Sequence, residues 1–242
     1  MPALSVPASP ASAAEPCASC GARSYSVCNA IEGADLAALA AAAVPQAVLA
    51  GAGFMDEGEP ATHFFNVTGG TARLFKLLPD GRRQVIGFAR PGHFLGLASA
   101  DAYTVSAEAV EPVRLCRFSR SRMRGLVDSF PQLEHRLLET ATHELATAQE
   151  AMVLLGRKTA RERVASFLVA WASGGPPCLP PATTLRLPMT RGDIADYLGL
   201  TIETVSRTLT RFRKDGLIAL PEPAEVRLLR PAALQAVAAG ED

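Results

Sequence analysis

The sequence lacks the segments that would direct a protein into or across a membrane. Residues 1–16 are mostly Ala, Ser and Pro, without the basic start and long apolar run of a secretory signal. No apolar stretch reaches spanning length, since the Ala-rich run 36–44 is short and weakly hydrophobic. We therefore expect a cytoplasmic protein with no membrane partner, and we expect residues 1–16 to be disordered because they offer little to bury.

The chain also lacks a net charge, because 24 Lys and Arg balance 24 Asp and Glu. The balance hides an uneven distribution. Residues 157–230 carry 12 basic and 7 acidic side chains, whereas residues 1–156 carry 12 basic and 15 acidic ones. A basic C-terminal part behind an acidic N-terminal part favours a nucleic-acid-binding domain attached to a sensing domain.

No nucleophile is assembled with a base in the sequence, so we expect no enzyme. Cysteine is also scarce, with five in all. An odd number of cysteines in a reducing compartment favours metal ligands or reactive thiols over a disulfide framework. Cys17, Cys20 and Cys28 lie on a short stretch with little predicted secondary structure, which could wrap around a metal centre. The expected fourth ligand is Cys116 in the apolar strand 113–118, whereas Cys178 lies in a Pro-rich break and is expected to be incidental.

Chemistry alone leaves the bound group open. Zinc accepts four thiolates and ranks first on the residues. A redox disulfide between Cys17 and Cys20 ranks lower because it leaves Cys28 idle. Haem on His63 or His93 is a further alternative, although lone histidines in turns are usually solvated. The rival function is a metal-bearing electron carrier, which would not need the DNA-binding pattern described below.

The order of the patterns predicts an α+β chain of three parts. Between about residues 51 and 118, short apolar runs alternate with turn signals such as Gly69-Gly70, which is typical of an antiparallel roll of short strands. We assign residues 17–130 to a sensor domain that comprises the cysteine cluster and this β-roll. Residues 131–156 are predicted to form a long helix, and residues 157–242 a winged helix-turn-helix domain.

The long helix carries apolar residues at alternating spacings of three and four, a heptad seam that ends at Gly156. The seam either packs on the core of its own domain or joins two copies of the chain. Alanines at alternate seam positions suit a close and reversible contact between two copies. We expect a homodimer whose interface is formed by Leu138, Ala141, Leu145, Ala148, Met152 and Leu155.

The stretch 190–212 has the pattern of a helix-turn-helix. Thr190 is a good N-cap with Asp193 three residues on, and Gly199 supplies the left-handed turn residue. Thr201 then caps a second helix. Its buried stripe is predicted to be Val205, Leu209 and Phe212. The segment 225–230 is expected to form part of a small strand pair, the wing.

The opposite face of the second helix carries side chains suited to base edges. Arg207 can pair with guanine through two hydrogen bonds, and Glu203 can accept one from a cytosine amino group. These two residues also fit an ordinary salt bridge on a solvated helix face. The basic residues that follow favour DNA, because they can contact phosphates. The predicted DNA-binding residues are Glu203, Ser206, Arg207, Thr210, Arg211 and Arg213.

The segment from Gly199 to Arg207 resembles the recognition segment of the FNR branch of the catabolite-activator (CRP/FNR) superfamily, whose hallmark is Glu-x-x-Ser-Arg. The resemblance covers residues 17–232, because the cysteine cluster also stands in the expected place. It reverses the preference for zinc and implies an oxygen-labile 4Fe–4S cluster. It also implies that the protein binds double-stranded DNA as a dimer when the cluster is assembled, at TTGAT half-sites in inverted repeat. The implied cluster ligands are Cys17, Cys20, Cys28 and Cys116.

Two further implications concern partners. The related cyclic-nucleotide branch needs an Arg, beside a Gly-Glu pair, to hold the cyclic phosphate, and residues 96–107 contain neither Arg nor Glu. We therefore expect no cyclic nucleotide. Members of the superfamily contact RNA polymerase through the part of the roll that corresponds to residues 79–82, Pro-Asp-Gly-Arg here. The resemblance thus implies RNA polymerase as a partner and activation as an outcome.

Overall fold

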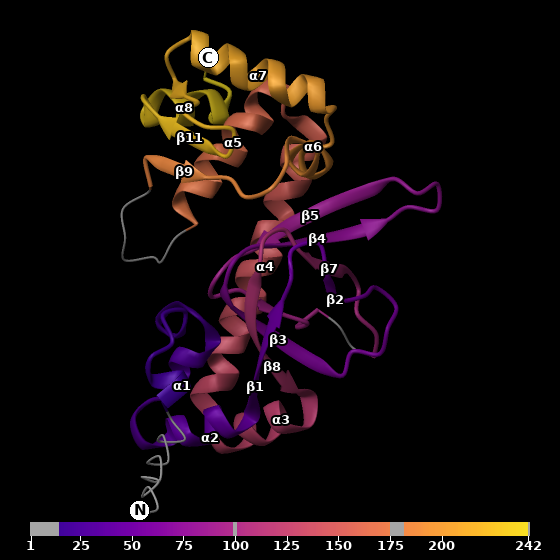
Figure 1. Cartoon of the computed structure of the whole chain (residues 1–242), viewed down its shortest axis with the longest axis vertical. Coiled ribbons are helices and arrows are strands. Elements are labelled where there is room, and N and C mark those ends of the chain that lie inside the picture. Colours follow the sequence, from indigo (N-terminus) through magenta and orange to yellow (C-terminus); the bar gives the residue numbers. More distant parts are fainter. Residues whose placement is uncertain (1–14, 99–100, 175–181, 242) are drawn as a thin grey trace, which may run out of the picture.

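The computed structural model describes residues 15–98, 101–174 and 182–241. Figure 1 shows a β-roll and a smaller C-terminal domain, joined by one long helix that runs along the roll. The expectations for residues 1–14 and for Cys178 lie outside the described residues. Glu15 and Pro16, also predicted to be disordered, are instead the first residues of helix α1 (Glu15–Ala18), the turn that carries Cys17.

The cysteine-bearing segment consists of short helical turns, where we expected little secondary structure. Part of the reason is local, because the Ser26 hydroxyl accepts a hydrogen bond from the Cys28 N–H (3.2 Å) and so caps the turn Val27–Ala30. Part is tertiary, because Val27 and Ile31 are buried against the roll and the long helix. After α1 come η1 (Arg23–Tyr25), η2 (Val27–Ala30), η3 (Gly33–Asp35) and α2 (Leu36–Ala42).

The middle of the chain forms two four-stranded antiparallel sheets, ordered β1-β8-β3-β6 and β2-β7-β4-β5. Inward residues of both sheets share one core, which confirms the predicted roll. The roll begins ahead of the predicted start near residue 51, because β1 pairs with β8 from Ala43↔Phe118 to Val48↔Val113. The strands are β1 (Ala43–Val48), β2 (Gly53–Met55), β3 (His63–Gly69), β4 (Ala72–Leu77), β5 (Arg83–Ala89), β6 (Phe94–Leu95), β7 (Ser106–Ala109) and β8 (Val113–Ser119).

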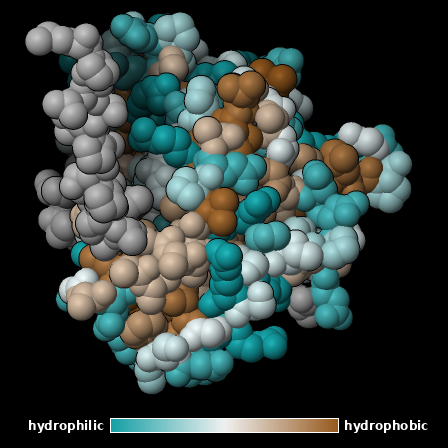
Figure 2. All heavy atoms as spheres, turned by 60° about the horizontal axis from the view of Figure 1, so that its bottom comes forward, coloured by the Kyte–Doolittle hydropathy of each residue, from teal (hydrophilic) through white to brown (hydrophobic). Residues whose placement is uncertain are grey.

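Helices α3 (Arg120–Ser129) and α4 (Pro131–Arg157) follow the roll. The observed bounds of α4 agree with the predicted range 131–156. Pro131 suits the first helical position because its missing N–H has no partner there in any helix. Within the described residues no helix is both long and apolar enough to cross a membrane. On the face seen in Figure 2, hydrophobic residues form small groups separated by hydrophilic ones.

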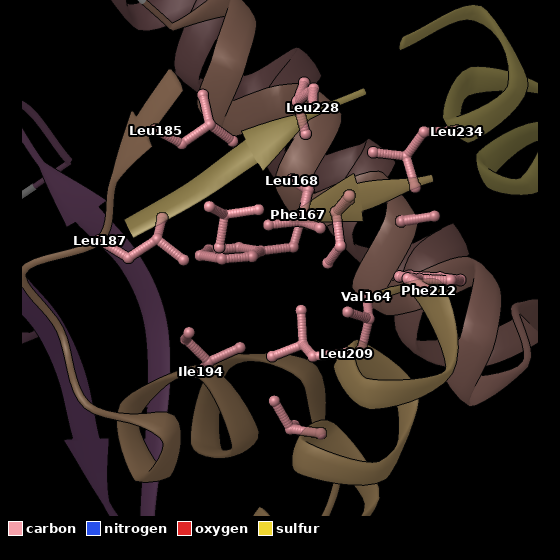
Figure 3. Close-up of a cluster of buried hydrophobic side chains, with 14 of the residues drawn as sticks. Val164, Phe167, Leu168, Leu185, Leu187, Ile194, Leu209, Phe212, Leu228 and Leu234 are labelled. Carbon is pink, nitrogen blue, oxygen red and sulfur yellow. The ribbon is translucent and has the colours of Figure 1, made fainter. Parts of the chain in front are cut away.

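In residues 157–174 and 182–241, the C-terminal domain packs four helices around a small antiparallel sheet. Figure 3 shows side chains of α5, α6, α7 and the sheet pointing into one common core. The sheet has the order β10-β11-β9, and the pairing of β10 with β11 is the predicted wing. The elements are α5 (Ala160–Ser173), β9 (Thr184–Arg186), α6 (Arg191–Leu198), α7 (Ile202–Lys214), β10 (Ile218–Ala219), β11 (Glu225–Leu228) and α8 (Pro231–Ala239).

Candidate functional site

Helix α7 is positioned by α6 and by the tight turn between them. The Thr190 hydroxyl accepts a hydrogen bond from the Asp193 N–H (3.1 Å), and the Asp193 carboxylate accepts one from the Thr190 N–H (3.0 Å). Helix α6 ends at Gly199, whose φ of 61° is the left-handed conformation that favours glycine. The Thr201 hydroxyl then caps α7 by accepting a hydrogen bond from the Thr204 N–H (3.2 Å). The predicted caps are confirmed.

The inner face of α7 is the predicted apolar stripe. Val205, Leu209 and Phe212 are at most 2% exposed. In Figure 3, Leu209 and Phe212 point into the same core as Ile194 of α6 and Val164 of α5. This packing fixes the rotation of α7 about its axis, so the residues half a turn away face outward.

The outer face of α7 presents side chains suited to DNA. Glu203, Ser206 and Arg207 are exposed, and Thr210 is half-buried. Hydrogen bonds from its own backbone N–H and from the Thr201 hydroxyl hold the pKa of Glu203 below its usual range. Arg207 makes no hydrogen bond or ion pair with any residue that the structure describes, so the alternative Glu203–Arg207 salt bridge is not formed. Its guanidinium is therefore available to a base edge.

Two arginines near the end of α7 have different surroundings. The Arg211 Nε donates to the Asp215 carboxylate (3.0 and 3.1 Å), whereas Arg213 is exposed. Arg161 of α5 donates to the same carboxylate (3.1 Å). Sequence reasoning missed Arg161 because its partner lies 54 positions later in the chain. The positive charge of Arg211 is thus partly balanced within the protein.

The seam residues of α4 lie on its exposed side. Leu138, Leu145 and Met152 are 65%, 60% and 72% exposed, and Ala141 and Ala148 are exposed as well. The core-facing side of the helix is a different stripe, formed by Leu133, Leu137 and Leu154. The alternative in which the seam packs on the core of its own domain is therefore wrong. That the seam joins two chains stays a prediction.

The four predicted cysteine ligands gather where the N-terminal turns meet strand β8. All four are free thiols. Cys28 is buried, and Cys17 and Cys116 pack against the same core. Cys20 is near enough for its charge to raise the pKa of each of the other three. The fold thus unites three residues of the N-terminal turns with one from the middle of the chain.

The pKa values of Cys17, Cys28 and Cys116 are raised by burial and by the charges of neighbouring thiolates. Burial raises the pKa of Cys28 to about 12, and the other three cysteines add to the increase, whereas a hydrogen bond with Ser26 lowers it. Burial, followed by the charges of Cys17 and Cys20, raises the pKa of Cys116 to about 11. Neighbouring thiolates thus oppose the ionisation of Cys17, Cys28 and Cys116, and a cationic centre would relieve this cost. The chemistry of the donor set therefore fits a thiolate-bound metal centre.

The positions of the side chains do not by themselves identify a metal site. Within residues 15–98, 101–174 and 182–241, no three Cys, His, Asp or Glu side chains form a group that could hold a metal ion. The metal ligands and the 4Fe–4S cluster therefore stay predictions.

Asn66 is a residue of this site that sequence reasoning missed. Its Nδ2 donates to the Cys28 Sγ (3.5 Å), and in the β3–β8 ladder it lies opposite Cys116. Asn66 is 1% exposed, and its Oδ1 has no hydrogen-bond partner among the described residues. The side chain thus links the turn of Cys28 to the strand of Cys116. A lone polar residue inside the run Phe64-Phe65-Asn66-Val67 was the only sequence signal.

Neither histidine of the haem alternative lies in a solvated turn as expected. His63 begins β3, and its Nδ1 shares a hydrogen bond with the Thr62 hydroxyl (2.8 Å). The His93 Nδ1 lies 3.0 Å from the Arg90 carbonyl oxygen. Burial lowers the pKa of both histidines. Local packing and hydrogen bonds therefore account for the positions of both histidines without a bound haem.

Two family models match parts of the chain. Residues 162–237 match the Crp-like helix-turn-helix domain, and residues 45–130 match the cyclic nucleotide-binding domain. The second match identifies the roll as a domain of that kind. Residues 96–107 contain neither Arg nor Glu, which is the reason for expecting no cyclic nucleotide in this roll. That expectation stays a prediction.

Whole-chain comparisons agree with the two domains. The nitrogen fixation regulation protein FixK of Bradyrhizobium diazoefficiens is 42% identical over 92% of this chain and 94% of its own. The transcriptional activator protein FnrL of Cereibacter sphaeroides is 36% identical over 84% of each chain. The solved structure of FixK2 from Bradyrhizobium japonicum matches with a TM-score of 0.75 and 35% identity, over 81% of this chain and 96% of that one. The chain therefore belongs to the CRP/FNR family of transcription regulators, which bind DNA as dimers and are not enzymes.

Proposed function

We propose that this protein is an oxygen-responsive transcription regulator that binds DNA when a 4Fe–4S cluster is assembled in the absence of oxygen. The observation that carries the proposal is the gathering of four free thiols, with Cys17, Cys28 and Cys116 in or against one core and Cys20 close enough to affect their pKa values. The ligands would be Cys17, Cys20, Cys28 and Cys116. When bound, the cluster supplies an oxygen-labile cross-link between the N-terminal turns and strand β8.

The coupling of this site to dimerisation runs through α4. Leu133, which is 1% exposed, and Leu137 lie in the same core as Cys28. Any loosening of the N-terminal turns therefore changes the support of the first turns of α4. The exposed seam, with Leu145 and Met152, continues on the same helix. Because two-fold operators need a dimer, weakening the seam lowers DNA affinity by mass action.

The DNA-reading element is α7, and the preferred operator is an inverted repeat of TTGAT half-sites. Each half-site contains one G·C pair, which Arg207 and Glu203 would contact on opposite bases. The exposed and internally unpaired state of Arg207 supports this role. Ser206 and Thr210 would adapt to neighbouring base edges, whereas Arg211 and Arg213 would contact phosphates.

Two further parts of the proposal concern partners and location. The tip of the β4–β5 hairpin is exposed; within it the Arg82 Nε donates to the Asp80 carboxylate (2.7 Å) and Gly81 has a φ of 84°. This tip would contact RNA polymerase and so activate transcription, an outcome in line with the name of FnrL, a transcriptional activator protein. The protein would act in the cytoplasm.

Anaerobic purification tests the sensing half directly. We expect a coloured protein with iron and sulfide in about equal amounts and four of each per chain, which loses its colour and its operator affinity in air. A colourless protein with one zinc ion would overturn the cluster. It would favour the second candidate, a zinc- or thiol-based regulator of the same family, which the four-thiol donor set also supports.

A further inference from the structure

A network of charges joins the β4–β5 hairpin of the roll to helix α6 of the DNA-binding domain. Asp193 is 1% exposed and accepts hydrogen bonds from Arg73 of β4 (2.7 Å) and Arg83 of β5 (2.9 Å). Arg83 also donates twice to the Asp196 carboxylate (3.1 and 2.8 Å). The Gln84 side chain donates to the main-chain oxygen of Asp196 (2.6 Å). In Figure 1, β5 runs close to α6 between the two domains.

A second contact lies on the same strand. The ring of Phe88 packs against those of Phe167, Trp171 and Tyr197, with centroids 5.7 to 6.3 Å apart. The guanidinium of Arg90 lies 4.3 Å from the centroid of the Trp171 ring and donates to the Trp171 carbonyl oxygen (3.2 Å). The aromatic contact buries apolar surface between the two domains, and the hydrogen bonds of the charge network fix their relative orientation.

The carboxylate of Asp193 has two tasks at once. Within its own domain it completes the N-terminal cap of α6, and across the domain boundary it holds two arginines. A buried carboxylate is costly without cationic partners. Swinging the DNA-binding domain away from the roll would remove both Arg73 and Arg83 from Asp193. The network therefore resists a change in the relative orientation of the two domains.

We propose that Asp193 and Asp196 are positioning residues, which hold the DNA-binding domain in one orientation on its own sensor domain through Arg73 and Arg83. The inference rests on the proposed function, since it concerns a dimer on two half-sites. In such a dimer the distance between the two α7 helices is set by the sensor domains. A signal then acts by shifting whole protomers, not by swinging each DNA-binding domain at the joint between α4 and α5.

The pair Arg83 and Asp196 offers the sharpest test, because both side chains are partly exposed and neither belongs to the cap of α6. Arg83→Ala and Asp196→Ala are measured on operators whose half-sites are correctly spaced, or one or two base pairs closer or farther apart, and on a single half-site. We expect each variant to bind the correct operator about tenfold more weakly and to lose preference for spacing. Affinity for the single half-site should not change.

Two further variants separate positioning from folding. Arg83→Lys should recover most of the spacing preference lost in Arg83→Ala, because an ammonium group keeps a cation beside Asp193 and Asp196. Lys76→Ala is the matched control, since it removes a β4 cation whose partner, Glu57, lies within the sensor domain. This control should keep both the affinity and the spacing preference of the wild type.

Three results would overturn the positioning role. One is an unchanged spacing preference in Arg83→Ala and Asp196→Ala. Another is an equal loss of affinity for the single half-site, which would indicate damage to the DNA-binding domain itself. The third is a wild-type protein that binds one half-site as well as two, and this result alone would overturn the proposed function as well.

Discussion

Replacing Arg207 by Ala tests the DNA-reading face most directly. The guanidinium is exposed and makes no hydrogen bond or ion pair with the described residues, so its removal costs the chain only a weak charge interaction with the exposed Glu203. We expect the free energy of unfolding to stay within about 0.5 kcal/mol of the wild-type value, as for other exposed sites. The effect should therefore appear almost entirely in DNA binding.

The size of the effect follows from the number of contacts. A two-hydrogen-bond contact between Arg and guanine is worth about 1–3 kcal/mol of discrimination. A dimer makes this contact twice, and contributions from distant sites add, so the operator should lose about 2–6 kcal/mol. At about 1.4 kcal/mol per factor of ten, affinity should fall roughly 30-fold to 20,000-fold.

Fluorescence anisotropy with a labelled operator under anaerobic conditions measures this loss, and selection from random DNA measures the base preference. Arg213→Ala is the matched control, because Arg213 is exposed on the same helix and is expected to contact phosphate. It should weaken all DNA nearly equally and reduce the salt slope by about one. If Arg207→Ala kept the sharp G·C requirement of the wild type, the register or orientation assigned to α7 in the major groove would be wrong.

Three substitutions test the other parts of the molecule. Cys116→Ser should abolish anaerobic DNA binding because an open iron site makes the cluster labile, whereas Cys178→Ser should bind normally; wild-type affinity in the first would remove Cys116 from the ligand set. Ala148→Glu should shift the reduced protein towards monomer in ultracentrifugation, since like charges would meet in the seam, and an unshifted equilibrium would count against that interface. Burial by itself would raise the pKa of Asp193, but hydrogen bonds from Thr190 and the charges of Arg73 and Arg83 outweigh this effect, so the pKa lies below its usual value. Relative to Asp193→Asn, its stabilisation should be constant above about pH 4 and decline as the pH falls through the lowered pKa; thermal unfolding between pH 7 and 3 checks this, and a constant difference would contradict it.

Features that depend on near neighbours in the chain could be predicted from the sequence. The caps at Thr190 and Thr201 and the left-handed Gly199 use hydrogen bonds or dihedral angles within a few residues. The buried stripe of α7 and the extent of α4 follow from helical periodicity, which converts spacing along the chain into direction in space. The winged helix-turn-helix and the outward-facing side chains of α7 could therefore be predicted from the sequence alone.

Features that depend on distant partners required the tertiary structure. Strand β1 is poor in strand-forming residues and exists because β8 supplies its hydrogen bonds. Asn66 meets Cys28 across 38 positions, and Arg73 meets Asp193 across 120. Nothing in the neighbouring sequence distinguishes these residues from other polar ones. Their contacts close long loops, and the entropy that this costs is offset only when both domains fold. The sequence by itself determined the caps, the buried stripe and the outward-facing side chains of α7, whereas the tertiary structure alone decided which thiols share a core and how the two domains are held together.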